Sequence, residues 1–234
     1  MRPLKLSEIF ASVCARGNSA LKWGNPEPWV QTEIFAEFHK LVKQSGWIPF
    51  NTEVPYVTHY PVQIPKPSSR DWKAMGTVKW IDLCLRSTDG NDWCWFEFKV
   101  RHADINKRSR KAALEARGVF RKDIVALLGF NINATAEIWR NPDNFTKAYW
   151  FESHLKPYAD KLQFGNHQFV SALLQLRGDW DEEIWHKETV MEQVNSWKAY
   201  RCKQRGEEFC ESKHLKLSSS PIGNHWFTYV KWQI

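Results

Sequence analysis

The first periodic stretch of the chain is helical. Residues 27–46 carry apolar side chains three and four positions apart, a spacing that places them on one face of a helix. Pro28 suits the first turn of a helix and Gly46 suits its end. We therefore predict one amphipathic helix over the whole stretch. Its apolar stripe consists of Val30, Ile34, Phe38, Leu41 and Val42.

Patterns typical of strands follow this helix. Residues 51–56 indicate a first strand, and residues 81–85 and 93–100 form apolar runs on either side of a polar segment. That segment contains Asp89 and Gly90, a dipeptide suited to the positive φ angles of a tight hairpin turn. The pattern predicts a β-hairpin that brings residues 81–85 back beside residues 93–100.

The remaining elements are predicted from weaker patterns. Residues 112–130 indicate a second helix, and residues 133–139 and 145–151 indicate strands around a turn. Further on, residues 188–203 suggest a helix and residues 225–232 a closing strand. The succession of a helix, strands, a second helix and a further strand predicts an α/β fold, with a central mixed sheet flanked by helices.

Length and composition support one globular domain. The chain has 234 residues, of which 43% are hydrophobic and 25% charged, a balance typical of globular rather than disordered proteins. We expect a single domain over residues 1–234, with a core at about 29–152 and an α+β extension at about 153–234.

Two classes of protein are disfavoured by the sequence. No apolar run approaches the roughly 18 to 20 residues of a membrane span, and Lys5, Ser7 and Glu8 interrupt any apolar leader. The five cysteines form no even disulfide framework, so Cys84 and Cys94 are predicted to be reduced thiols in the core. We expect a cytoplasmic protein without membrane contact.

Charged residues in the hairpin are the candidate chemistry. Glu97 and Lys99 alternate with Phe96 and Phe98, so the two charges share one face of their strand. The hairpin brings Asp82 to the same place. Two carboxylates packed together repel one another unless a cation compensates them. Oxygen ligands suit Mg²⁺ or Mn²⁺ rather than Zn²⁺, and a lysine beside them can orient a metal-bound water.

The same tripeptide pattern also occurs without such a context. Glu211-Ser212-Lys213 is a second copy to which we assign no role. An ordinary surface salt bridge on an aromatic sheet therefore remains the alternative interpretation of Glu97 and Lys99. The apolar strands on both sides and the aspartate across the turn favour the catalytic interpretation.

Asp82 followed by Glu97-Phe98-Lys99 and a basic segment resembles the PD-(D/E)xK nuclease superfamily. The resemblance covers roughly residues 29 to 140. It implies a restriction endonuclease-like core of order α-β-β-β-α-β. One departure is Ile81, which stands where the name of the motif has proline.

The resemblance also implies a role for each residue of the motif. Asp82 and Glu97, with the backbone carbonyl of Phe98, would bind Mg²⁺, and Lys99 would position the attacking water. The implied reaction is in-line attack of water on a phosphodiester, leaving a 5′-phosphate and a 3′-hydroxyl.

Members of this superfamily often add an acidic residue from the helix before the first strand. Glu33 and Glu37 flank the apolar stripe of the predicted helix one turn apart. Glu33 is preferred as a catalytic residue and metal ligand because it lies near the helix start, with Glu37 as the alternative. Two solvated glutamates are the competing interpretation, and Glu53 on the first strand is a weaker candidate.

The charge of the chain suits a polyanionic partner. The formal net charge is +7, and cations cluster directly after the hairpin. In a nuclease they would contact phosphates and provide salt-sensitive affinity, although a solvated helix face has the same appearance. The residues predicted to contact nucleic acid are Arg101, Lys107, Arg108, Arg110, Lys111 and Lys122.

The leading hypothesis is a Mg²⁺-dependent endonuclease or exonuclease that acts on DNA in restriction, repair, recombination or defence against mobile elements. The alternative is a non-catalytic nucleic-acid-binding subunit of a larger complex with the same fold. A third hypothesis is a protein-interaction domain in which the charged residues are structural. The sequence leaves open whether the protein acts as a monomer, a homodimer or part of a larger complex.

Overall fold

The computed structural model describes residues 5–16, 27–58, 77–102, 123–124, 126–141, 153–176, 216–222 and 225–233. Its named helices are α1 (Leu6–Arg16), α2 (Glu27–Ser45), α5 (Ile132–Arg140) and α7 (Ala159–Phe164), with a 3-10 turn η3 (Lys156–Tyr158) before α7. Its strands are β1 (Trp47–Thr58), β2 (Thr77–Ser87), β3 (Asp92–His102), β4 (Asn166–Leu176), β5 (Lys216–Ile222) and β6 (His225–Gln233). None of these helices is long and apolar enough to cross a membrane.

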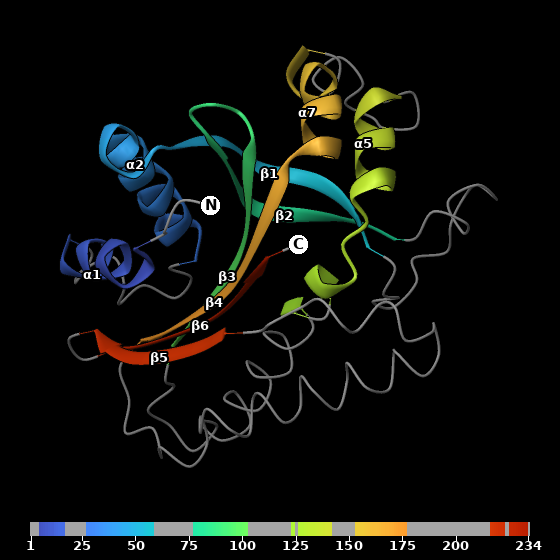
Figure 1. Cartoon of the computed structure of the whole chain (residues 1–234). Coiled ribbons are helices and arrows are strands. Elements are labelled where there is room, and N and C mark those ends of the chain that lie inside the picture. Colours follow the sequence, from blue (N-terminus) through green and yellow to red (C-terminus); the bar gives the residue numbers. More distant parts are fainter. Residues whose placement is uncertain are drawn as a thin grey trace.

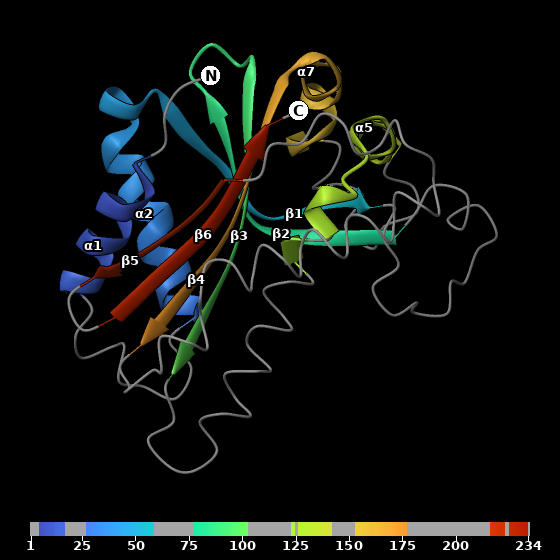
Figure 2. The same cartoon turned by 60° about the horizontal axis from the view of Figure 1, so that its bottom comes forward.

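The strands form one mixed sheet in the order β1-β2-β3-β4-β6-β5. Only β3 and β4 are parallel neighbours in this sheet, and the other four neighbouring pairs are antiparallel. Helices α1 and α2 lie on one face, and α5 and α7 lie on the other (Figures 1 and 2). The α/β class, with a mixed sheet flanked by helices, is therefore confirmed.

Each face of the sheet carries its own core. The layer beneath α1 and α2, here the α2 layer, includes Phe96 and Phe98 of β3 and Phe10 of α1. Phe10 stacks on Phe227 of β6, with ring centroids 4.0 Å apart. The opposite layer, here the α5 layer, includes Trp95 of β3. Side chains that alternate along β3 thus fill the two layers in turn, as the sequence predicts.

Helix α2 forms where the apolar stripe predicts it. Val30, Ile34 and Phe38 are fully buried at intervals of four residues, which places them on one side of the helix. Gly46 follows the last helical residue with a φ of 70°, a left-handed conformation that suits glycine after a helix end. Cys84 and Cys94 are buried free thiols, also as predicted.

Residues 133–139, predicted to be a strand, are instead helical and belong to α5. The Asn131 side chain accepts a hydrogen bond from the Ala134 N–H at 3.0 Å and caps the helix start. Thr135 and Trp139 are both fully buried, and residues four apart share a helical face. The prediction failed because a helix with buried Thr and Trp resembles a half-buried strand in composition.

Helix α5 covers the exposed edge of β1. The Val57 N–H donates to Thr135 Oγ1 at 3.0 Å, the Trp139 indole N–H donates to the Pro55 carbonyl at 3.0 Å, and the Asn131 N–H donates to the Val57 carbonyl at 2.9 Å. An edge strand otherwise presents unpaired backbone groups that invite association. These contacts satisfy backbone groups of that edge at Pro55 and Val57 from within the chain.

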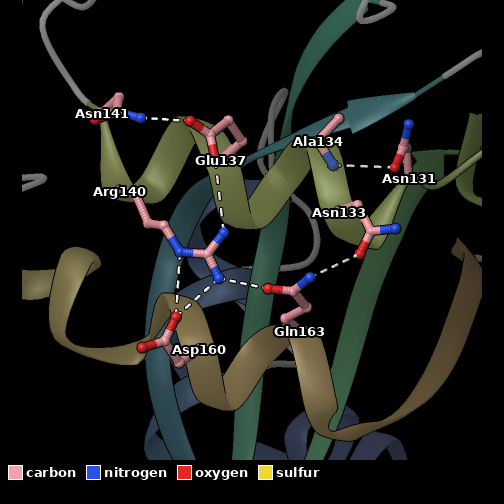
Figure 3. A network of polar contacts seen from close by, with 8 residues as sticks. All are labelled: Asn131, Asn133, Ala134, Glu137, Arg140, Asn141, Asp160 and Gln163. Carbon is pink, nitrogen blue, oxygen red and sulfur yellow. Dashed lines mark hydrogen bonds and ion pairs between the residues drawn. The ribbon is translucent and has the colours of Figure 1, made fainter.

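Polar contacts also tie α5 to α7 (Figure 3). Arg140 of α5 donates to Asp160 Oδ1 from Nη2 at 2.8 Å and from Nε at 3.1 Å. Gln163 of α7 accepts from Arg140 and donates to Asn133 Oδ1 at 3.3 Å. The two helices therefore sit on the sheet as a linked pair.

The C-terminal part of the chain completes the central sheet. Strand β4 lies beside β3 along its whole length, from the pair Asp92 and Asn166 to the pair His102 and Leu176. The predicted closing strand at 225–232 is confirmed as β6, which pairs with β4. The boundary expected near residue 152 thus does not divide the sheet. The predicted strand at 145–151 and helix at 188–203 lie outside the described residues.

Candidate active site

The predicted hairpin positions the candidate site. Strands β2 and β3 pair antiparallel from Leu83 opposite Phe96 to Arg86 opposite Trp93. Gly90 in the turn has a φ of 80°, the left-handed conformation expected of a hairpin glycine. The two strands are therefore held in register at the turn, and their backbone pairing ends just before Asp82 and Glu97.

A local irregularity sets the direction of Asp82. Ile81 packs in the α5 layer, whereas Leu83 packs in the α2 layer, although residues two apart on a regular strand share a face. On β1, Val54 is paired with Ile81 and Thr52 with Leu83, so Glu53 falls opposite Asp82. Glu53 has a φ of 51°. The change of face therefore lies on β2 at Asp82, opposite the positive φ of Glu53, whereas the register of β1 and β2 shifts between Pro49 and Asn51.

The Asp82 carboxylate occupies the gap where β2 and β3 separate. Its Oδ2 accepts the backbone N–H of Phe98 at 2.8 Å, and its Oδ1 accepts from Gln31 Nε2 of α2 at 3.2 Å. The ammonium of Lys99 lies 3.6 Å from Oδ2. A backbone donor, a helix side chain and a cation therefore fix the orientation of this carboxylate, whose side chain is 18% exposed.

Glu97 is almost completely buried next to Asp82. Burial raises the pKa of its carboxyl well above the usual 4.5, and the negative charges of Asp82 and Asp123 and a hydrogen bond with Asp82 raise it further. The positive charge of Lys99 opposes this shift of the pKa. Without a cation, the structure therefore favours a protonated Glu97 that shares its proton with Asp82.

Asp123 is a further carboxylate at the site, and sequence reasoning missed it. Its Oδ2 lies 3.9 Å from Lys99 Nζ, and its Oδ1 lies 3.8 Å from Lys79 Nζ. Lys99 is thus held between Asp82 and Asp123. The signal in the sequence was an aspartate four residues before Leu127 on a predicted helix, where both lie on one face. An acidic residue on an otherwise apolar helix face is unusual and indicates a candidate site residue.

Two buried hydroxyls lie beside the carboxylates. Tyr56 is fully buried, and its hydroxyl has no hydrogen-bond partner among the described residues. Burial raises its pKa well above 10, and the charges of Glu97, Asp123 and Asp82 add to the shift. Ser171 of β4 is paired in register with Glu97, and its buried Oγ is likewise without a partner in the described part of the chain. The α5 layer thus contains a compact polar group within an aromatic core.

The predicted helix acids contact α1 instead of Asp82. Glu33 Oε2 pairs with Arg16 Nη2 at 3.0 Å, and Glu37 Oε2 pairs with Arg16 Nη1 at 2.7 Å. Ser12 Oγ donates to Glu37 Oε1 at 3.3 Å. The residue of α2 that reaches Asp82 is Gln31, near the start of the helix. The structure therefore places Glu33, the preferred helix acid, and Glu37, its alternative, at the contact with α1 and not at Asp82.

The other candidates fall outside the site or outside the described residues. Glu53 is exposed and lies opposite Asp82 on β1, with a φ of 51°. The backbone of Arg101 continues β3 beyond Lys99. The remaining predicted nucleic-acid contacts lie outside the described residues; they are Lys107, Arg108, Arg110, Lys111 and Lys122.

The oxygen atoms at the site can be compared with the ligands that a Mg²⁺ ion requires. Within the described ranges, no group of three or more His, Cys, Asp or Glu side chains is arranged to hold a metal ion. Asp82 and Glu97 are the two carboxyls that meet directly. Two carboxylates, a main-chain carbonyl such as that of Phe98, and water are a donor set that suits Mg²⁺, which keeps several waters in most protein sites.

Comparison of the chain with known protein families, with curated proteins and with solved structures finds no match.

Proposed function

We propose that the protein is a Mg²⁺-dependent nuclease of the PD-(D/E)xK superfamily that hydrolyses phosphodiester bonds, in DNA by preference. The observation that carries the proposal is the meeting of Asp82, Glu97 and Lys99 where β2 and β3 separate. Lys99 Nζ lies 3.6 Å from Asp82 Oδ2, and Glu97 shares a hydrogen bond with Asp82. An aromatic core gains no stability from such a group, because buried charges and polar groups cost free energy.

The fold is compatible with the proposal. A helix, α2, precedes three antiparallel strands, and β4 then adds in parallel beside β3. We infer a restriction endonuclease-like core from this order together with the position of the charged residues on β2 and β3. The net charge of +7 supports a polyanionic substrate.

The roles of the residues follow from their contacts. Asp82 is fixed by Phe98 and Gln31, so its carboxylate is oriented before any ligand binds. A bound cation would favour the ionised form of Glu97, because its charge would offset the burial and the charge repulsion that raise the pKa of this carboxyl. A Mg²⁺ ion held by Asp82, Glu97 and the Phe98 carbonyl would activate a water and stabilise the charge that develops on the phosphate.

Lys99 completes the arrangement. Its ammonium lies between Asp82 and Asp123, at 3.6 and 3.9 Å, so two carboxylates restrict its position. From there it orients the attacking water by donating a hydrogen bond and stabilises negative charge on the phosphate. Asp123 acts through Lys99 and is a positioning residue.

The test is cleavage of supercoiled plasmid and of a labelled single strand in Mg²⁺, Mn²⁺ or EDTA. Lys99→Ala should abolish the metal-dependent cleavage of the wild type. Lys213→Ala is the matched control, because Lys213 ends the second copy of the Glu-x-Lys pattern and has no assigned role. Equal cleavage by Lys99→Ala and wild type would contradict the site assignment.

A non-catalytic nucleic-acid-binding subunit is the second candidate function. The observation that favours it is that Asp82 already accepts two hydrogen bonds within the protein. The raised pKa of Glu97, caused first by burial, also favours its neutral form, which needs no cation. This alternative predicts salt-dependent binding of nucleic acid and no cleavage under any of the metal conditions.

A further inference from the structure

A pocket of about 260 Å³ lies at the hairpin end of the sheet, away from the candidate active site. It is formed by the first half of β1, the end of β2 and the segment that leads into α7. Along β2, its residue Arg86 is four positions from Asp82, which is roughly 13 Å at about 3.3 Å per residue. The lining side chains include Arg86, Phe50, Asn51, Tyr158, Ser153 and His154.

The positive charge of the pocket has no ion-pair partner in the described part of the chain. Among the described residues, no Asp or Glu lines the pocket, and none forms an ion pair with Arg86. A second cation approaches the same place, because a Cβ built on Gly90 would lie 3.5 Å from Arg86 Nη1 and 3.9 Å from Lys161 Nζ. Two cations close together attract an anion.

The guanidinium is held in place before any ligand arrives. It lies over the ring of Tyr158, with Cζ 4.9 Å from the ring centroid, a favourable cation–π arrangement. Its Nε–H is buried and has no acceptor among the described residues. A buried donor without an acceptor costs free energy, so this position calls for an explanation beyond packing.

The walls of the pocket divide into two kinds. Phe50 and Tyr158 pack edge to face, with ring centroids 4.9 Å apart, and provide a rigid aromatic surface. Asn51, Ser153 and His154 add polar groups beside Arg86, and Ser153 Oγ is hydrogen-bonded to His154 Nδ1 at 2.6 Å. An oxyanion can accept several hydrogen bonds from such groups while an apolar part of the same ligand lies against the rings.

We propose that this pocket binds the phosphate group of a nucleotide, with Arg86 as the principal anion ligand and Phe50 and Tyr158 as the surface for the attached nucleoside. The inference is independent of the proposed nuclease activity. The phosphate could belong to a free mononucleotide or to the end of a nucleic-acid strand, and the experiment distinguishes these two sources.

The experiment is calorimetric titration of the full-length protein in EDTA, which prevents metal-dependent cleavage. The probes are adenosine 5′-monophosphate, adenosine, and a short single strand with or without a 5′-phosphate. We expect the monophosphate to bind and adenosine to bind at least about tenfold more weakly, because a charge-assisted contact is worth about 1.5 kcal/mol or more. A phosphorylated strand that binds more tightly than the monophosphate identifies a strand end as the source. Equal affinities identify the free nucleotide.

Three variants make the result specific. Arg86→Gln should weaken binding of the monophosphate about tenfold or more, and Arg86→Lys should weaken it less, because a lysine keeps the charge without the planar donor pair. Arg86→Lys also serves if Arg86→Gln does not fold. Lys156→Gln is the control, since Lys156 is an exposed cation of η3 that does not line the pocket. The proposal is overturned if no phosphate probe binds, or if binding is the same in wild type and the Arg86 variants.

Discussion

Substitution of Glu33 and Glu37 separates a structural role of α2 from a catalytic one. Both glutamates pair with Arg16 of α1, at 3.0 and 2.7 Å, and α1 contributes five buried residues to the α2 layer. Removing either carboxylate should therefore loosen the contact between α1 and α2. It should leave cleavage unchanged, because the residue of α2 that contacts Asp82 is Gln31.

The expected magnitudes follow from exposure. The Glu37 side chain is 11% exposed and that of Arg16 is 34% exposed, so their pair lies between a surface pair, worth about 0 to 1 kcal/mol, and a buried one, whose loss costs about 3 to 5 kcal/mol. We expect Glu37→Ala to lower the free energy of unfolding by about 2 kcal/mol. Glu33, whose side chain is 28% exposed, should contribute less than about 1 kcal/mol.

Urea unfolding measures these differences, and thermal unfolding checks them. For a chain of this size, Glu37→Ala should lower Tm by roughly 4 to 8 °C. In an Arg16→Ala background the cost of Glu37→Ala should shrink, because the partner is already absent. Plasmid cleavage is measured with the same preparations. Loss of cleavage in Glu33→Ala or Glu37→Ala, at unchanged stability, would refute the placement of these acids at the α1 contact.

Three further predictions concern the site. Glu97→Gln should stabilise the protein in the absence of divalent cations, and this gain should grow as pH rises above 4.5. The reason is that the wild type loses stability from that pH upward, until the pH passes the raised pKa of Glu97. Measurement of Tm against pH for both proteins checks this prediction. Glu53→Gly should be more stable than Glu53→Ala by about 1 kcal/mol in urea unfolding, because a side chain at a φ of 51° is strained. Gln31→Ala should slow cleavage by about fivefold, the equivalent of one hydrogen bond of about 1 kcal/mol to Asp82; an unchanged kcat would remove Gln31 from the site.

Local patterns were sufficient to predict the hairpin and α2. The turn at Asp89 and Gly90 and the alternation around Glu97 are contained in a few neighbouring residues, as is the four-residue spacing of Val30 and Ile34. Such features depend on backbone geometry alone, so a single sequence reveals them. The convergence of Asp82 and Lys99 followed directly, because a hairpin fixes which residues face one another.

Features that depend on distant partners were not predicted. Thr135 and Trp139 are buried because they bond the backbone of β1, which no local pattern reveals. Glu37 forms an ion pair with Arg16 of α1, a helix that was not predicted from the sequence. Asp123 reaches Lys99 only through the packing of a later segment on the sheet. In each case tertiary contacts, rather than spacing along the chain, decide what a side chain does.

The most direct test of the proposed active site is the cleavage of supercoiled plasmid in Mg²⁺ by wild type, Asp82→Asn and Asp92→Asn. Asparagine can still accept the hydrogen bond from the Phe98 N–H, so Asp82→Asn removes the charge and keeps the local structure. Asp92 is the control because it is a buried aspartate of the same hairpin that bonds Asn166 outside the site. We expect Mg²⁺-dependent cleavage by wild type and Asp92→Asn, and none by Asp82→Asn. Cleavage by Asp82→Asn at the wild-type rate would contradict the proposed active site.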